Sequence, residues 1–126
     1  MSERHGRRAG LGAARRVGAL AALVFVAGLG VAGAARSADD AAQLAQGKAL
    51  FTGDAMPPCA LCHTLRDAGT SGAVGPVLDE LQPDAARVAT ALRNGIGAMP
   101  SYKATLKEEQ IQALARYVAK ASGGAK

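Results

Sequence analysis

The most constraining feature of the sequence is the pentapeptide Cys59-Ala60-Leu61-Cys62-His63. Two cysteines three positions apart, followed at once by histidine, have the spacing at which haem is attached covalently to protein. Each thiol adds to one vinyl group of the same ring, and the histidine is then placed to bind the iron through an imidazole nitrogen. We therefore expect one covalent haem c, tethered through Cys59 and Cys62, with His63 as an axial iron ligand.

Other uses of this motif fit the rest of the chain less well. A structural zinc site needs four ligands, usually Cys or His, and the one histidine outside the motif is His5, in a segment that we expect to be removed. A thioredoxin-like dithiol expects a βαβ context, which no run of β-branched and aromatic residues predicts. A structural disulfide would close too small a loop to restrict the unfolded chain much. Thiol–disulfide exchange remains an alternative, and it predicts thiols that titrate after reduction.

Residues 1–37 have the pattern of a cleavable secretory signal peptide, which leaves residues 38–126 as the mature domain. Five arginines precede the apolar stretch from Val17 to Ala35, and small residues follow it. Residues 17–35 also approach the roughly 20 that a membrane-spanning helix needs, so an uncleaved anchor is the alternative. Their many glycines and alanines make them weakly hydrophobic, which favours removal. We therefore expect export to the periplasm, with membrane contact only if this segment stays attached.

The charge of the whole chain is misleading, because most of it lies in the N-terminal segment. The formal net charge is +5, and the first segment holds five arginines against Glu3. From Arg36 onward there are ten Lys and Arg against nine Asp and Glu, a net charge of +1 (10 − 9) before haem propionates are included. A nearly neutral domain gives no support for nucleic-acid binding or for long-range steering toward an acidic partner.

Helices joined by long loops are predicted for the mature domain, which makes it all-α. The first helix is expected from about Asp40 to Phe51, with Asp39 or Asp40 as its cap. The second is expected from about Pro83 to Asn94, where the following glycine stops it. The intervening residues 67–77 are rich in Gly, Ser and Pro and are predicted to be irregular.

The last helix has the clearest local signals. Thr105 and Glu108 have the spacing of a capping box, and Ile111, Leu114 and Val118 repeat at helical spacing. Gly123 and Gly124 are expected to end this helix and to leave a short loose tail.

The hydrophobic core that this domain offers is small. It has about 90 residues, three aromatic side chains (Phe51, Tyr102 and Tyr117) and no tryptophan. A covalently held haem would supply a large apolar face at the centre. We therefore expect the haem-free chain to be poorly folded.

The second axial ligand decides whether the iron transfers electrons or binds a small molecule. A methionine thioether favours ferrous iron and raises the reduction potential, and the mature chain offers Met56 and Met99. Met56 lies three residues before Cys59, on the tethered side of the ring. Met99 lies in a flexible loop between two predicted helices and is the better candidate.

Five short motifs occur in a fixed order along the mature chain. They are Gly47-x-x-x-Phe51, Cys59-x-x-Cys62-His63, Gly75-Pro76-x-Leu78, Met99-Pro100-x-Tyr102 and Leu114-x-x-Tyr117-Val118. This order resembles the small class I cytochromes c across essentially the whole mature chain.

The resemblance implies three to five helices with long loops around one covalently bound haem. It places Gly47 and Phe51 where the first helix crosses the last, against Leu114 and Tyr117. It also implies that the Pro76 carbonyl accepts a hydrogen bond from the free ring nitrogen of His63. Leu78 would pack on the haem, and Met99 would be the sixth iron ligand.

Within that family, the stretch from Gly75 to Pro100 is most similar to the cytochrome subunits of bacterial sulfite dehydrogenases. This similarity implies a molybdenum-containing sulfite dehydrogenase subunit as electron donor and a downstream cytochrome or oxidase of the respiratory chain as acceptor. One departure from the family pattern is the seven-residue segment Thr52 to Pro58, which is longer than usual and affects the geometry just before the motif.

A six-coordinate haem has no open position for a substrate. The sequence therefore predicts a monohaem electron carrier, not an enzyme in its own right. The alternative is a five-coordinate haem that binds a small gas or peroxide, which requires Met99 to be off the iron; the Gly95-Ile96-Gly97 run would allow such loop mobility.

Overall fold

A computed structural model describes the backbone of residues 23–125 and the side chains of residues 36–125. The chain divides into two units, Met1–Ala35 and Arg36–Lys126. Most of the expected signal peptide, including His5, lies outside the described residues. Among those that are described, no helix combines the length and apolar character that crossing a membrane requires.

The first helix of the domain begins much earlier than predicted. Helix α1 spans Leu23–Ala49 and continues directly into a wider turn, η1, at Leu50–Asp54. The expected caps Asp39 and Asp40 therefore lie inside the helix, and the prediction that the helix starts there is wrong. The physical reason is the alanine-rich sequence on both sides of them, since alanine is the best helix former.

The second and last helices end as predicted but begin elsewhere. Helix α3 spans Ala85–Asn94, two residues inside the predicted start, because Asp84 Oδ1 accepts a hydrogen bond from the Arg87 N–H at 2.7 Å and acts as the N-cap. Gly95 ends it with a φ of 70°, a conformation that favours glycine.

Helix α4 spans Glu108–Ser122, and the predicted capping box of Thr105 and Glu108 is wrong. The N-cap is Lys107, whose N–H donates to Gln110 Oε1 at 2.9 Å. The Thr105 hydroxyl instead donates to the Tyr102 carbonyl at 3.3 Å. The same Ser/Thr-to-Glu spacing thus belongs to the preceding turn.

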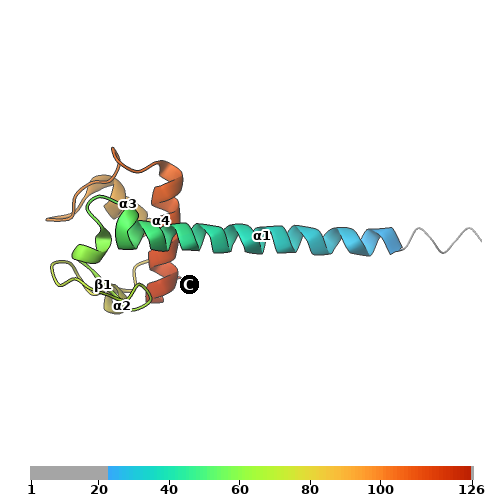
Figure 1. Cartoon of the computed structure of the whole chain (residues 1–126), viewed down its shortest axis with the longest axis horizontal. Helices are drawn as coiled ribbons and strands as arrows, with labels where there is room; N and C mark the ends of the chain where they lie inside the picture. Colours follow the sequence, from blue (N-terminus) through green and yellow to red (C-terminus); the bar gives the residue numbers. More distant parts are fainter. Residues whose placement is uncertain (1–22, 126) are drawn as a thin grey trace, which may run out of the picture. The chain divides into compact units, whose positions relative to one another are not determined.

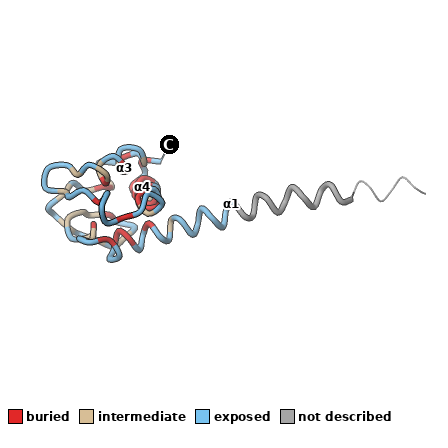
Figure 2. The backbone as a smooth tube through the Cα atoms, turned by 90° about the horizontal axis from the view of Figure 1, so that it is seen from above, coloured by how far each residue is buried: buried red, intermediate tan, exposed pale blue. Residues whose placement is uncertain are grey.

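Helix α4 packs against α3 and runs across the carboxy-terminal end of α1 (Figure 1). At the crossing of α1 and α4 a Cβ atom on Gly47 would lie 2.4 Å from the Ala113 carbonyl oxygen and 2.4 Å from Tyr117 Cβ. The Phe51 and Tyr117 rings meet edge to face, with centroids 6.1 Å apart and planes 63° apart. Buried residues accordingly concentrate in α4, with Leu50 and Phe51 of η1 buried as well (Figure 2).

The segments between these helices contain four further short elements besides η1. A turn of 3₁₀-helix, η2, spans Cys59–Leu61, and α2 spans Leu78–Leu81. Strands β1 (Thr64–Leu65) and β2 (Thr70–Ser71) pair antiparallel, with Thr64 opposite Ser71 and Leu65 opposite Thr70. The fold is therefore predominantly helical, as predicted, with one two-residue ladder in the segment after the motif.

The carboxy-terminal tail is packed as far as Gly124, although a loose tail was expected. The Gly124 N–H donates to the Ala119 carbonyl at 2.8 Å. A Cβ atom on Gly124 would lie 2.3 Å from the Pro83 carbonyl oxygen. This close approach to the segment before α3 holds the tail against the domain.

Candidate haem-binding site

The pentapeptide motif folds into one tight helical turn. The Cys59 carbonyl accepts hydrogen bonds from the N–H of Cys62 at 3.1 Å and of His63 at 2.9 Å. Cys59 is buried, whereas Cys62 and His63 are partly exposed, and both cysteines are free thiols. The turn thus presents two thiols and an imidazole within five residues of the chain.

The His63 ring is fixed by the two residues Gly75 and Pro76. Its Nδ1 lies 3.0 Å from the Pro76 carbonyl oxygen. A carbonyl can only accept, so Nδ1 is the donor, and Nε2 keeps its lone pair for a metal. A Cβ atom on Gly75 would lie 2.4 Å from His63 Cε1, so the ring rests directly against the Gly75 backbone.

Two threonines hold the backbone that follows His63, and sequence reasoning missed both. The Thr70 hydroxyl donates to the His63 carbonyl at 2.9 Å and accepts from the Leu65 N–H at 3.1 Å. The Thr64 hydroxyl donates to the Gly72 carbonyl at 3.0 Å. Only the hydroxyl residues flanking a glycine-rich turn signal these bonds in the sequence, and such residues favour local bonds to backbone.

Gly72 was also missed, and it packs against the motif itself. A Cβ atom on Gly72 would lie 2.5 Å from the Cys62 carbonyl carbon and 2.6 Å from the His63 nitrogen. The Gly75 N–H donates to the Cys62 carbonyl at 2.8 Å. The loop from His63 to Gly75 therefore folds back onto the motif as a close-packed unit.

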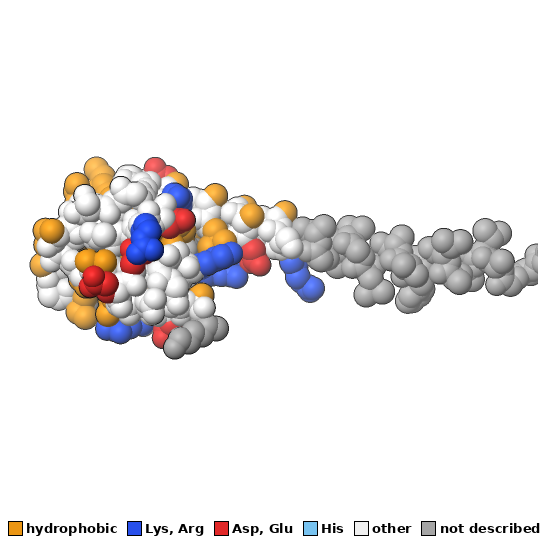
Figure 3. All heavy atoms as spheres, turned by 90° about the horizontal axis from the view of Figure 1, so that it is seen from below, with side chains coloured by type: hydrophobic (Ala, Val, Ile, Leu, Met, Phe, Trp, Pro, Cys, Tyr) orange, Lys and Arg blue, Asp and Glu red, His pale blue; other side chains and the backbone are white. Residues whose placement is uncertain are grey.

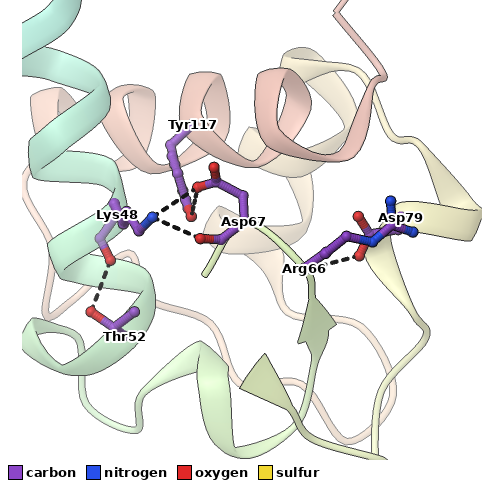
Figure 4. A network of polar contacts seen from close by, with 6 residues as sticks. All are labelled: Lys48, Thr52, Arg66, Asp67, Asp79 and Tyr117. Atoms are coloured by element: carbon purple, nitrogen blue, oxygen red, sulfur yellow. Dashed lines mark hydrogen bonds and ion pairs between the residues drawn. The ribbon is translucent and has the colours of Figure 1, made fainter. Parts of the chain in front are cut away.

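A polar network anchors this loop to both long helices (Figure 4). Lys48 Nζ of α1 donates to the Asp67 carbonyl at 2.7 Å and to Asp67 Oδ2 at 3.2 Å. The Tyr117 hydroxyl of α4 donates to the same Oδ2 at 2.7 Å. The hydrogen bond from Tyr117 is the largest cause that lowers the pKa of the Asp67 carboxyl, and the bond from Lys48 is the next. Nearby, the Arg66 N–H donates to Asp79 Oδ2 at 2.9 Å and ties the loop to α2.

Of the two candidate methionine ligands, only Met99 is directed into the protein. Met56 is 73 % exposed. Met99 packs against the buried core and pairs with Ile96 through backbone bonds of 3.0 and 3.1 Å. Leu78, which was expected to pack on the haem, is buried at the start of α2.

Tyr102 connects the Met99 loop to the segment before the motif. Its hydroxyl donates to the Pro57 carbonyl at 2.7 Å, across 45 positions of sequence. Burial, with a further contribution from nearby Cys59 and Cys62, raises the pKa of Tyr102 to about 12. The hydroxyl is therefore a neutral donor at physiological pH. The sequence motif included Tyr102 but not this partner.

The thiol chemistry does not favour disulfide exchange. Burial raises the pKa of Cys59 to about 11, so it stays protonated at neutral pH, whereas the thiolate is the nucleophile in exchange.

The donor set fits an iron that is already bound by a porphyrin. Within residues 36–125 no group of three or more His, Cys, Asp and Glu side chains could hold a metal ion. The His63 imidazole and the Met99 thioether supply two donor atoms. A six-coordinate iron therefore needs four more donors from another source. Porphyrin nitrogens supply four, and the two thiols of the motif supply the tether.

Three comparisons with known proteins each found a similar protein or family. A model of the family described as cytochrome c oxidase, cbb3-type, subunit III matches residues 42–118. Cytochrome c6 of Synechocystis sp. is 32% identical over 108 residues, which cover 79% of this chain and 81% of that protein. The crystal structure of the c-type cytochrome SorU from Sinorhizobium meliloti aligns with a TM-score of 0.62 and 54% identity, over 67% of this chain and 95% of that chain. All candidate site residues, from Cys59 to Met99, lie inside the matched range.

Proposed function

The chain belongs to the monohaem c-type cytochromes and is an electron carrier, and from that premise we propose how it holds its haem. Cys59 and Cys62 form the two thioether bonds. His63 binds the iron through Nε2, and Met99 binds it from the opposite face. Bound haem supplies an iron that alternates between ferric and ferrous states, so one electron is taken up and released without bond cleavage.

The proposal rests above all on the orientation of His63. The Pro76 carbonyl at 3.0 Å from Nδ1 selects the tautomer that leaves Nε2 free. Gly75 allows the backbone to approach the ring more closely than any other residue would. A histidine that served only to fill the core would not need its second nitrogen left unbonded.

Exposed apolar side chains support electron entry close to the motif. Among the described side chains of residues 36–125, the large hydrophobic ones with at least 65% exposure are Met56, Leu61, Val74 and Ile96. Each lies within three residues of Cys59, Cys62, Gly75 or Met99 in the sequence. Elsewhere, on the face in Figure 3, acidic and basic side chains lie beside one another. Such a surface suits docking by short-range contact more than long-range steering.

We propose a molybdenum-containing sulfite dehydrogenase subunit as the electron donor and a downstream cytochrome or oxidase as the acceptor. The support is the similarity of the stretch from Gly75 to Pro100 to cytochrome subunits of such dehydrogenases. We also propose that residues 1–37 are removed on export and that the carrier works in the periplasm, where covalent haem attachment takes place.

The first test is the visible spectrum of the holoprotein produced by periplasmic expression, before and after acid–acetone extraction. We expect the colour to stay with the polypeptide and the ferric form to show a sulfur-to-iron charge-transfer band. We also expect no thiol to react with a thiol reagent after reduction and unfolding. Loss of all colour to the acetone would overturn attachment through Cys59 and Cys62.

Met99→Ala tests the sixth ligand, with Met56→Ala as the matched control. Met99→Ala should abolish the charge-transfer band, lower the reduction potential and allow carbon monoxide to bind the ferrous form. Met56→Ala should retain the wild-type values, because Met56 points into solvent. If carbon monoxide already binds the wild type tightly, the five-coordinate alternative is correct.

Donor identity is tested by mixing the oxidised carrier with a purified sulfite dehydrogenase and sulfite in stopped flow. Rapid reduction at low carrier concentration, absent when sulfite is omitted, is the expected result. Equal rates with an unrelated dehydrogenase would remove the sulfite enzyme as the specific donor and leave the carrier function intact.

A further inference from the structure

The loop that holds Met99 is anchored at its base by α3. The Gly95 N–H donates to the Ala91 carbonyl at 2.8 Å, and the Tyr102 N–H donates to the Leu92 carbonyl at 2.7 Å. The Ser101 hydroxyl donates to the Arg93 carbonyl at 2.5 Å. These bonds fix where the loop leaves and rejoins the domain, but they join it only to its neighbouring helix.

The Tyr102 side chain links this loop to the other side of the site. Tyr102 is 3% exposed, and its hydroxyl reaches the carbonyl of Pro57, two residues before Cys59. Pro58 then leads directly into η2, the turn that contains the motif. The bond therefore joins the loop that contains Met99 to the segment that leads into the turn before His63.

We propose that Tyr102 is a positioning residue that keeps the Met99 loop closed over the site by its hydrogen bond to Pro57. This inference rests on the proposed ligation by Met99. Tyr102 acts through the loop and does not touch the iron. The same hydrogen bond gives a role to the long segment Thr52 to Pro58, which brings the accepting Pro57 carbonyl to Tyr102.

The hydrogen bond from Tyr102 to Pro57 stabilises the closed loop and not the open one. In the closed state the Pro57 carbonyl is satisfied by the tyrosine hydroxyl. When the loop opens, this carbonyl of an exposed residue can bond to water instead. Removing the hydroxyl therefore penalises the closed state alone and shifts the population toward the open one.

Imidazole binding to the ferric protein measures that shift, because imidazole competes with Met99 for the iron. Its apparent affinity rises in proportion to the open fraction. For Tyr102→Phe we expect about a fivefold increase in imidazole affinity, as the loss of one hydrogen bond predicts, and a lower reduction potential. The matched control is Tyr117→Phe, which removes a hydroxyl bonded to Asp67, a residue of a different loop.

The outcomes separate the inference from the proposed function. An increase in Tyr102→Phe with near wild-type affinity in Tyr117→Phe supports the positioning role. Equal increases in both variants, or none in Tyr102→Phe, overturn it while ligation by Met99 stands. A wild type without the sulfur-to-iron band overturns both.

A second measurement avoids dependence on the folding of Tyr102→Phe. The chain has two tyrosines, so in the Tyr117→Phe background a fluorotyrosine label reports on Tyr102 alone. Saturating imidazole should shift its fluorine NMR signal, because opening of the loop breaks the bond to Pro57. An unchanged signal when the charge-transfer band is fully lost would show that Met99 leaves the iron without Tyr102, and would overturn the proposal.

Discussion

A Cβ atom on Gly75 would lie 2.4 Å from Cε1 of His63 and 2.7 Å from its Nδ1. The imidazole is therefore in direct contact with the Gly75 backbone, while the carbonyl of the next residue, Pro76, bonds to the same ring. Two adjacent residues thus set both the position and the rotation of His63. An axial ligand that must keep one orientation in two iron oxidation states benefits from such a rigid support.

Gly75→Ala should displace the His63 ring. The added methyl group cannot be accommodated without rotating the imidazole, which stretches the bond to Pro76. We expect the holoprotein to lose about 1–3 kcal/mol of stability, as overpacking does, and the low-spin ferric spectrum to change. Guanidinium unfolding and electron paramagnetic resonance measure the two effects. Gly53→Ala is the control, since nothing beyond its chain neighbours and its own helical turn lies within 4 Å of its Cβ position; equal behaviour of the two variants would contradict the contact.

Gly47→Ala should weaken the crossing of α1 and α4 without altering the iron. The new Cβ would lie 2.4 Å from both the Ala113 carbonyl oxygen and Tyr117 Cβ, so the helices must move apart. The expected cost is again about 1–3 kcal/mol in denaturant unfolding. The visible spectrum and reduction potential should stay at wild-type values. A changed charge-transfer band with unchanged stability would show that this crossing supports the site and not the fold.

The sequence predicts the residues that meet by short motifs better than it predicts where elements begin. Gly47, Phe51 and Tyr117 meet as the family resemblance implies. Two helices can cross this closely only where a small residue faces a side chain that packs against it. The predicted start of α1 was wrong because two aspartates do not interrupt a helix when alanine-rich sequence flanks them on both sides. The Thr105 hydroxyl was assigned to the wrong turn, since its spacing to Glu108 fits a capping box as well as a preceding turn.

The contacts around the site were less predictable because they join segments far apart in the chain. Tyr102 and Pro57 are 45 positions apart, and Tyr117 and Asp67 are 50 apart. Neither pair has a local pattern, and each depends on the path of a loop that only the folded chain determines. Thr70 is near His63 in sequence, but its bond to the His63 carbonyl exists only because β1 and β2 pair in one register.

Protonation of Asp67 should make the domain less stable in acid. Its folded pKa is lowered by the Tyr117 hydroxyl and by Lys48, so its contribution is fully present above the ordinary carboxyl pKa of about 3.9. The contribution is lost as the pH falls through the lower folded value. Because the side chain is half exposed, we expect less than about 1 kcal/mol.

The test compares Asp67→Asn with wild type in urea at neutral pH and again well below the carboxyl pKa. The variant should be less stable at neutral pH, and the difference should shrink in acid. Asp54→Asn is the control, because Asp54 forms no ion pair with another described residue. A difference that persists unchanged in acid would assign the effect to packing around Tyr117 and not to the charge of Asp67.

The haem-free chain should lack a cooperative fold. Its aromatic side chains from residue 36 onward are Phe51, Tyr102 and Tyr117, all of them already buried, and a domain of about 90 residues has little further apolar surface to bury. Cys59→Ala with Cys62→Ala, expressed in the periplasm, removes the tether and leaves the rest of the sequence intact. We expect helical far-ultraviolet dichroism without a sharp thermal transition and with weak near-ultraviolet signals. A steep, two-state unfolding curve in this variant would show that the helices around Gly47 and Tyr117 form a sufficient core by themselves, and that haem adds redox chemistry to a fold that is complete without it.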